Sequence, residues 1–418
     1  MPHKKIFFGL FILLSLTGLL LRVHIAARSA SLSEYDYHFE YIEEIRAHYS
    51  VPAAGLSFPA FMRGTANPQR WHPPAYHMLG ALAGSLHPNA PAVPLKIFSL
   101  LCGVLTLWLS FLILRHFFGD DYELTLPALT LLLFLPGHIT LTNLASNDVL
   151  VGPVSALFLL LSLKWWNAQL SPGRLVSLSL LCGLLLLTKY SGLISLVYLN
   201  AILLYSYTRH KTSFARYSGS ALLALGIPAA LAGWFYWANY TIWGNPLHMD
   251  GYSRLREHTF ISFRFADLLY SRFNNWHESS SVFTGFFAGF FTFDWINSGV
   301  REFYLRNAVL CLALPPLAIS GAGFISSVKK EKYYLLNLFF LLVLLSTAKF
   351  LWKFNLGVGI LKSCYLMFLA PLYAVYFAEG CAALRAWKKP AFYSCLAAAL
   401  LLHVSVAAYY CRFFACGE

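Results

Sequence analysis

Long apolar segments separated by short polar connections are the dominant pattern of this chain. Each segment holds about 20 predominantly apolar residues, which is enough for a helix to cross the hydrocarbon core of a bilayer. By hydropathy we predict about eleven spans. Their approximate ranges are 5–27, 94–117, 123–143, 147–168, 173–190, 191–208, 216–239, 305–327, 332–350, 357–380 and 390–411. The pattern predicts an all-α polytopic membrane protein, in which residues 1–418 form a single transmembrane domain.

The charges of the connections predict how the spans are oriented. Lys4 and Lys5 precede the first span, and with the N-terminus in the cytoplasm four of the five inside connections carry net positive charge. An excess of Lys and Arg is typical of cytoplasmic loops. The outer face then receives two long loops, residues 28–93 and 240–304. We expect the first of them to contain helices that lie in the membrane interface.

The first apolar segment is expected to remain in the protein as a span. It is long, and its apolar core is not followed by the small-residue cleavage site of a signal peptide. Arg22 and His24 lie near its outer end, and we expect these side chains to extend toward the interface, as long basic side chains near helix ends do.

Composition supports the membrane class and singles out one stretch. The chain is 58% hydrophobic and 12% charged, whereas soluble domains carry about 25% charged residues. Of its 18 acidic residues, five lie in "EYDYHFEYIEEI", residues 34–45. As a helix this stretch would carry its carboxylates on one face, which suits an interfacial helix. The net charge is +13, and the basic inside connections account for it. We therefore expect membrane lipids and not nucleic acid as partners.

The start of this acidic stretch contains the candidate catalytic residues Glu34, Asp36 and His38. Aromatic side chains flank Asp36 on both sides, and a carboxylate in an apolar setting can have a raised pKa and take up a proton near neutral pH. Asp36 is therefore the candidate general base. The later glutamates of the stretch are equally well explained as a solvated face.

Further polar motifs fall on the same outer face. They contain His72 in "RWHPPAYHML", Asn147 and Asp148 in "TNLASNDVL", Lys189 and Tyr190 in "TKYSG", and Lys362 and Tyr365 in "GILKSCYLMFLAP". Each has an ordinary structural explanation, such as an acid in the first turn of a helix or a lysine that reaches the interface. Charges gathered at one level of a membrane protein nevertheless indicate a shared polar cavity. Two lysines in that cavity would suit a phosphate or diphosphate.

The order of these motifs resembles that of membrane glycosyltransferases of the GT-C type. An acid in the first outer loop is followed by "HPP", by "ND" at the start of the fourth span, by "TKYSG", by "GNPL" after the seventh span, and by "YLMFLAP". The resemblance covers nearly the whole chain. It is strongest to the bacterial branch that is similar to protein O-mannosyltransferases and to the aminoarabinose transferase of lipid A.

The resemblance implies a GT-C-like fold and a function in the cell envelope. Such enzymes take a sugar from a polyprenyl-phosphate donor, similar to dolichyl-phosphate-mannose, and transfer it to a lipid, glycan or protein acceptor. The transfer takes place on the outer, periplasmic face of the bacterial inner membrane. In-line attack by an acceptor hydroxyl would invert the anomeric carbon.

The resemblance also implies roles for individual residues. Asp36 matches the first-loop acid that acts as base or orients the acceptor, and either Glu34 or His38 takes the second role beside it. Asp148 matches the later acid that binds a divalent cation, Mg²⁺ or Mn²⁺, or holds the substrate. Lys189 matches a residue that binds the donor phosphate. Lys362 would do the same, although relatives often have arginine before the tyrosine of this motif.

Two other functions fit parts of the pattern. A transporter or flippase of lipid-linked glycans would show repeated halves and polar residues at the membrane midplane, whereas here the polar motifs gather at one face. A polymerase or ligase that uses diphosphate-linked donors would rely on arginines in a long outer loop. The second long loop does contain Arg254, Arg256, Arg264 and Arg272.

Overall fold

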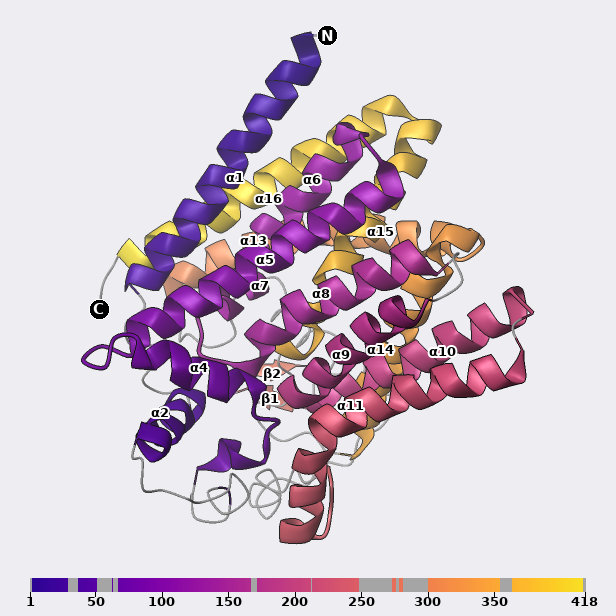
Figure 1. Cartoon of the computed structure of the whole chain (residues 1–418). Coiled ribbons are helices and arrows are strands. Elements are labelled where there is room, and N and C mark those ends of the chain that lie inside the picture. The colour runs from indigo at the N-terminus through magenta and orange to yellow at the C-terminus, as the bar shows by residue number, and fades with distance from the viewer. Residues whose placement is uncertain are drawn as a thin grey trace.

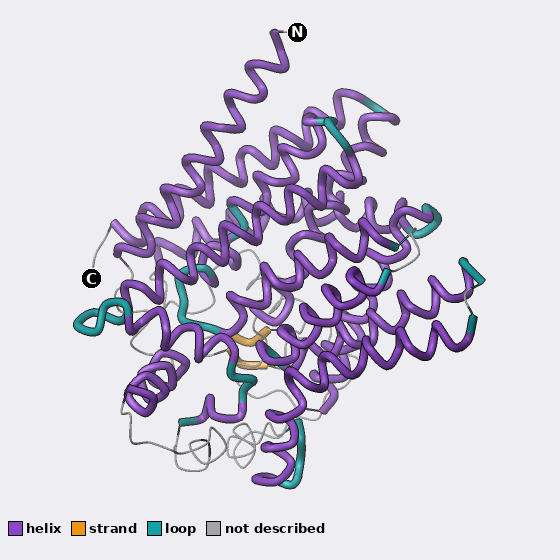
Figure 2. Tube along the Cα trace, viewed as in Figure 1, coloured by secondary structure: helices purple, strands orange, loops and turns teal. Residues whose placement is uncertain are grey.

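The structure is a computed structural model that describes most of the chain. The described residues are 2–28, 37–50, 62, 67–166, 171–211, 213–247, 273–275, 278–280, 300–353 and 363–415. They are almost entirely helical, as Figures 1 and 2 show. The exception is one antiparallel pair of three-residue strands, in which Phe273 lies opposite Ser280.

The helices follow one another with short connections. In chain order the longer helices are α1 (Pro2–Arg28), α2 (Tyr37–Ser50), α4 (Ala75–Ser85), α5 (Ala92–Phe118), α6 (Tyr122–Leu133), α7 (Pro136–Leu141), α8 (Asn147–Trp165), α9 (Pro172–Thr188), α10 (Leu193–Arg209), α11 (Phe214–Trp243), α13 (Val300–Ser327), α14 (Tyr334–Lys353), α15 (Ala370–Trp387) and α16 (Lys389–Ala415). Short 3-10 helices are η2 (Pro68–Trp71), η3 (Tyr190–Gly192), η7 (Glu331–Tyr333) and η8 (Ser363–Leu369), and the strands are β1 (Phe273–Asn275) and β2 (Glu278–Ser280).

The described helices confirm a polytopic, all-α membrane protein. Within the described residues, eight helices are long and apolar enough to cross a membrane, and α6 and α9 are shorter apolar helices. With α1, these helices correspond in position to the eleven predicted spans, but the exact number that cross the membrane stays a prediction. The predicted span at 123–143 is interrupted, because Leu135 is extended before Pro136, which starts α7. A residue before proline is disfavoured in the helical region.

Polar side chains fix where several helices begin. Ser171 and Ser213 accept hydrogen bonds from the backbone N–H groups of Arg174 and Arg216, at the starts of α9 and α11. Such caps satisfy a donor that has no partner within the helix. At the other end of α11, Gly244 has a φ of +69°, a left-handed conformation that glycine adopts without steric cost.

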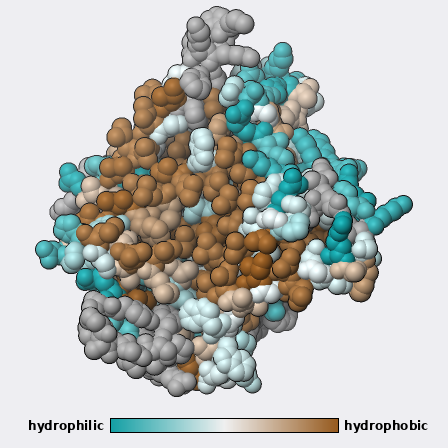
Figure 3. Space-filling model, viewed as in Figure 1, coloured by the Kyte–Doolittle hydropathy of each residue, from teal (hydrophilic) through white to brown (hydrophobic). Residues whose placement is uncertain are grey.

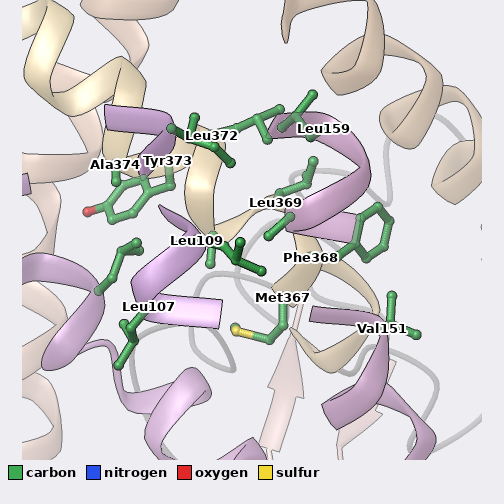
Figure 4. Close-up of a cluster of buried hydrophobic side chains, with 14 of the residues drawn as sticks. Leu107, Leu109, Val151, Leu159, Met367, Phe368, Leu369, Leu372, Tyr373 and Ala374 are labelled. Carbon is green, nitrogen blue, oxygen red and sulfur yellow. The ribbon is translucent and has the colours of Figure 1, made fainter. Parts of the chain in front are cut away.

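The most buried span is α15, which lies at the centre of the bundle. In the most apolar 18-residue stretch of this span, 83% is buried, compared with 28% in the corresponding stretch of α11. Figure 4 shows Met367, Phe368 and Leu369, just before α15, among aliphatic side chains of α5 and α8. Outside this core the surface is apolar across the middle of the face in Figure 3 and more hydrophilic at its edges. This distribution is the one expected of a protein surrounded by lipid.

Two glycines allow α13 and α15 to pack with their backbones in contact. A Cβ atom added at Gly323 would lie 1.8 Å from the carbonyl oxygen of Tyr376, and one at Gly380 would lie 2.2 Å from that of Ile319. Small residues permit this close approach of helices in membranes. The contact fixes the position of α15 and of η8 before it.

Arg22 of α1 is fully buried, which differs from the expectation that it extends to the interface. Its guanidinium donates hydrogen bonds to the carbonyl of Gly18 at 3.0 Å, to the carbonyl of Leu133 at 2.5 Å and to Nδ1 of His138 at 3.1 Å. The physical reason is the break after α6, because the last carbonyls of a helix have no partner within it. Arg22 donates to two of them, those of Leu132 and Leu133, from a neighbouring helix.

Ion pairs gather at the end of the bundle where α6 begins and α13 and α15 end. Arg385 pairs with Asp121, and Lys330 pairs with the buried Glu379, whose Oε2 accepts a hydrogen bond from the Tyr333 hydroxyl at 2.6 Å. These contacts join connections that the sequence predicts on the cytoplasmic side of the membrane. The candidate site lies at the opposite end, where α8 begins and α9 ends.

Candidate functional site

The structure brings Asp148 and Lys189 together at the start of α8 and the end of α9. The two helices pack against each other, and Asn147 donates a hydrogen bond from Nδ2 to the carbonyl of Thr188 at 3.4 Å. This contact aligns the two helix ends. The ammonium group of Lys189 then donates to Oδ1 of Asp148, and the two side chains are 13% and 7% exposed.

Both carboxylate oxygens of Asp148 have partners. The Ser146 hydroxyl donates to Oδ2 at 3.3 Å, and its oxygen accepts from the Asp148 backbone N–H at 3.3 Å. An acid in the first turn also interacts favourably with the positive end of the helix dipole. Ser146 and Lys189 therefore hold the Asp148 carboxylate in place at the start of α8.

This arrangement bears on whether Asp148 binds a metal ion. Among the residues that the structure describes, no group of three or more His, Cys, Asp and Glu side chains is placed to hold an ion. Divalent cations such as Mg²⁺ take several oxygen ligands, whereas Asp148 faces an ammonium group. The described residues around Asp148 therefore do not fit a metal site.

The turn after Lys189 connects the site to the first outer loop. The Tyr190 hydroxyl donates to the carbonyl of Trp71, and it accepts a hydrogen bond from Nδ2 of Asn239 at 2.9 Å. The turn needs its glycine, because a Cβ at Gly192 would lie 2.4 Å from the backbone of Leu185. Tyr190 thus ties together the α9–α10 turn, η2 of the first loop and the end of α11.

Within the first loop, α2 and α4 pack together and bring two histidines into contact. Nδ1 of His38 lies 2.9 Å from Nε2 of His77, and the rings are nearly parallel. The ring of His72 lies 5.9 Å from that of His38 and 6.3 Å from that of Tyr190. A continuous row of polar side chains therefore runs from His38 to the turn that carries Lys189.

His77 differs from the other two histidines in its burial. It is fully buried, and burial together with the nearby His72 lowers its pKa to about 3, although the Pro73 carbonyl acts in the opposite direction. His77 is therefore neutral at physiological pH.

Arg70 is a cation at the same end of the molecule. Its guanidinium lies 5.4 Å from the ring centroid of Trp71 and 4.9 Å from that of Trp243, at the end of α11. Contacts between arginine and tryptophan rings are favourable. They place η2 against α11 and hold a positive charge next to His72 in the sequence.

The predicted site residues that the structure describes gather at one end of the bundle. These are His38, His72, Asn147, Asp148, Lys189 and Tyr190. Glu34, Asp36 and Lys362 lie outside the described residues, and so does the side chain of Tyr365, whose backbone belongs to η8. η8 packs against α7 and α8. Its backbone is therefore close to the start of α8, the helix that carries Asn147 and Asp148.

Sequence reasoning missed His77, Arg70, Asn239 and Trp243. His77 and Arg70 belong to the motif that contains His72, in which two prolines fix the local backbone. Their position near these prolines is the signal that could have identified them. Asn239 and Trp243 lie in "YWANYTIWGNPL", an outer-face segment that the sequence marks as polar without showing what it contacts.

Comparisons with known proteins identify the fold. No protein-family model matches the chain, and no curated protein matches it. Among solved structures, the chain is similar to ArnT from Cupriavidus metallidurans bound to undecaprenyl phosphate, with 15% identity, a TM-score of 0.50 and coverage of 93% of this chain. The chain has the fold of ArnT. It spans 62% of the length of that structure, and at this identity the similarity shows the fold alone.

Two other solved structures are similar at lower TM-scores. One is the Archaeoglobus fulgidus oligosaccharyltransferase in complex with Zn and sulfate, with 13% identity, a TM-score of 0.45 and coverage of 96% of this chain and 52% of the other. The second is ArnT from Cupriavidus metallidurans in the apo state, with 15% identity, a TM-score of 0.40 and coverage of 89% and 77%. The first of these structures thus shows a shared fold, which agrees with the resemblance that the motif order carries.

Proposed function

We propose that the chain is a GT-C-type glycosyltransferase that uses a polyprenyl-phosphate-linked sugar as donor. The observation that carries the proposal is the Asp148–Lys189 pair, at the same end of the bundle as His38 and His72. The fold adds support, because the similar ArnT structure contains undecaprenyl phosphate. The acceptor is a hydroxyl group of a lipid, glycan or protein.

Lys189 is the residue that would bind the donor phosphate. Its ammonium group pairs with Asp148, and its side chain is 13% exposed. An ammonium group can neutralise the charge that develops on a departing phosphate, which is the main electrostatic requirement of the reaction. Asp148 holds the ammonium in place. Lys362 and Tyr365 are the further candidates for binding the donor phosphate.

The first outer loop would supply the base. Asp36 is the first choice, and Glu34 or His38 takes the second role. The base removes the proton of the acceptor hydroxyl while its oxygen attacks the anomeric carbon, and the bond from that carbon to the phosphate oxygen breaks. Attack opposite the leaving group inverts the anomeric centre. Retention of configuration in the product, seen by NMR, would contradict this step.

The proposed orientation puts the N-terminus in the cytoplasm and the site in the periplasm of a bacterial inner membrane. It is supported by the basic connections that the sequence places at the opposite end. A divalent cation at Asp148, Mg²⁺ or Mn²⁺, is the alternative role for this acid. It would have to displace Lys189, so the proposed transfer does not depend on it.

The test is sugar transfer by the full-length protein in lipid nanodiscs. Synthetic polyprenyl-phosphate sugars serve as donors, and the measurement is release of polyprenyl phosphate together with a glycosylated product from added membrane lipids. At donor concentrations near the wild-type KM, we expect release that is strongly reduced in Lys189→Met and unaffected by EDTA. Release only from diphosphate-linked donors would favour a polymerase or ligase. Movement of intact donor across proteoliposomes without release would favour a flippase.

A further inference from the structure

At the end of the bundle opposite the candidate site, basic and acidic side chains are unevenly distributed. The acidic side chains described at this end all take part in ion pairs: Asp120, Asp121, Glu123, Glu331 and Glu379. They belong to α6, η7, α15 and the connection before α6. Residues 149–249, in contrast, contain no Asp or Glu. The connections α8–α9 and α10–α11 therefore contribute positive charge without a carboxylate of their own.

Four cations at these two connections form what we call the α8–α11 basic surface. They are Lys164, Arg174, Lys211 and Arg216. Among the described residues, none of the four forms an ion pair with an acidic side chain. Arg174 is half-buried and the other three are exposed. Clustered charges of one sign create a potential that attracts an anion.

Aromatic side chains join the two connections into one surface. Trp166 stacks on Tyr205 of α10 with ring centroids 5.1 Å apart. The Arg174 guanidinium lies 5.8 Å from the ring centroid of Trp165, and that of Arg209 lies 5.9 Å from the centroid of Trp166. The α10–α11 connection lies at the right-hand edge of the bundle in Figure 1, where the surface in Figure 3 is hydrophilic. Trp and Tyr are enriched at the level of lipid headgroups, so these contacts favour that level for the cations.

Two of the four cations occupy the same position in the first turn of a helix. Ser171 caps α9 and Ser213 caps α11, and the backbone N–H groups three residues later, of Arg174 and Arg216, donate to the serine hydroxyls. Glutamate or glutamine is favoured at this position, because the start of a helix carries a partial positive charge. The two arginines therefore add to the positive potential of the helix starts instead of offsetting it.

We propose that the α8–α11 basic surface binds the phosphate headgroups of anionic phospholipids. It lies at the opposite end of the bundle from Lys189, so it is distinct from the proposed donor site, and it involves no chemical step. The connections of residues 166–171 and 210–213 are short. The cations therefore stay at the ends of the spans, where phospholipid headgroups lie.

Apolar side chains beside the cations favour a lipid over a water-soluble acidic partner. Phe214 and Leu222 of α11 are both 73% exposed, and α11 is among the least buried of the described spans. A phospholipid supplies a phosphate for the cations and acyl chains for these side chains. A water-soluble acidic partner supplies only the charge.

The test is lipid binding by the full-length protein in detergent micelles, measured by native mass spectrometry. The probes are phosphatidylglycerol, phosphatidylcholine and inorganic phosphate. We expect phosphatidylglycerol to bind about tenfold more tightly than phosphatidylcholine or better, and the preference to fall as salt is added, because exposed charges are screened. Equal affinity for the two lipids would overturn the proposal. Displacement of phosphatidylglycerol by millimolar inorganic phosphate would overturn it in favour of a site for free phosphate.

A double variant, Lys211→Gln with Arg216→Gln, tests the surface itself. One basic residue near an anionic membrane surface contributes about fivefold in affinity, so we expect phosphatidylglycerol to bind about 10- to 30-fold more weakly. Binding of phosphatidylcholine should stay the same. Both side chains are exposed, so the fold should tolerate their replacement.

The matched control is Lys388→Gln with Lys389→Gln. It removes the same charge from the α15–α16 connection, at the same end of the bundle, and both lysines are exposed. Phosphatidylglycerol affinity should stay within about twofold of the wild type. Equal losses in the two double variants would show a general effect of net charge and would overturn the proposal.

Lys189→Met separates this surface from the proposed donor site. We expect this variant to keep the preference for phosphatidylglycerol. Loss of the preference in Lys189→Met, with normal binding in the Lys211 and Arg216 variant, would place the lipid at the donor site and overturn the proposal. The measurement needs no sugar donor. A lipid preference in a protein that transfers no sugar would therefore contradict the proposed function and leave the α8–α11 basic surface standing.

Discussion

The ammonium group of Lys189 pairs with the carboxylate of Asp148 across the contact of α8 and α9, although 41 positions separate the two residues in the chain. Both side chains are largely buried. In such a setting a lone charge is costly, because it loses its hydration without a partner. The pair therefore places a lysine in a low-dielectric position where it can also meet an anionic substrate.

The first prediction is that Asp148 acts on the donor through Lys189. Lys189→Met should raise KM for the donor about 10- to 100-fold, which is the loss expected for one hydrogen bond to a charged group. Asp148→Asn should have a smaller effect, because the ammonium remains but is less well placed. The double variant should resemble Lys189→Met alone. Steady-state kinetics of the four proteins give the coupling between the two residues.

Lys349→Met is the control for the loss of a positive charge. Lys349 is an exposed lysine near the end of α14, so its removal changes net charge without touching the pair. It should leave KM unchanged within about twofold. If the effects of Asp148→Asn and Lys189→Met simply add, the two residues do not form one functional unit.

The second prediction concerns the tether between the α9–α10 turn and the first outer loop. Tyr190→Phe removes the donor to the Trp71 carbonyl and the acceptor for Asn239. Leaving a buried polar group without its partner costs about 1–3 kcal/mol. Because the tether also positions His72, we expect kcat/KM to fall about tenfold, measured by the same release assay.

Tyr236→Phe separates this effect from simple loss of a hydrogen bond. The Tyr236 hydroxyl donates to the carbonyl of Leu186 at 3.0 Å, within the helices of the bundle. This variant should lower the melting temperature and leave kcat/KM nearly unchanged. Equal kinetic losses in both variants would argue against a special role of the loop tether.

The sequence predicted the membrane class and the clustering of the site, but not its internal contacts. One predicted span starts at Asn147 and Asp148, and the next one ends at Lys189 and Tyr190. Because consecutive spans cross the membrane in opposite directions, these two span ends lie on the same face. The pairing of Asp148 with Lys189 depends on which helices pack together. Hydropathy is nearly uniform around these spans and carries no such information.

The contacts of Arg22 and His77 could not be predicted from the sequence either. Arg22 lies near the end of an apolar segment, which is the usual position of an arginine that reaches the interface. Its burial depends on the break at Leu135 and Pro136, where carbonyls of a different helix need a donor. His77 stands in an apolar stretch, and its partner His38 lies 39 positions earlier. Only the packing of α2 on α4 reveals this contact.

The third prediction is a pH dependence of stability that comes from His77. The folded protein lowers the pKa of this histidine from 6.5 to about 3, so the unfolded chain binds the extra proton over that interval. The contribution is complete above pH 6.5 and is lost as pH falls toward 3. At pH 5 the folded state should be about 2 kcal/mol less stable for this reason alone.

Unfolding of wild type and His77→Gln at pH 7.5 and pH 5 measures this contribution. Altered packing lowers the stability of the variant at both pH values, but the difference between the two pH values should shrink. Tyr76, whose ring contacts that of His77 edge-on, provides the control for altered packing as Tyr76→Phe, which should keep the wild-type difference. An unchanged difference in His77→Gln would show that this histidine is not the source.

The fourth prediction compares two glycines of α13, of which one, Gly323, lies against the backbone of α15 and the other, Gly321, does not. A Cβ at Gly323 would lie 1.8 Å from the Tyr376 carbonyl oxygen of α15, whereas a Cβ at Gly321 would meet nothing within 4 Å. Gly323→Ala should therefore force the helices apart and cost about 1–3 kcal/mol or more. Gly321→Ala should stabilise the protein by about 0.5–1 kcal/mol, because alanine loses less backbone freedom in a helix. Thermal unfolding of the two variants in the same nanodiscs gives shifts of opposite sign, and a destabilising Gly321→Ala or a neutral Gly323→Ala would contradict the close packing of α13 on α15.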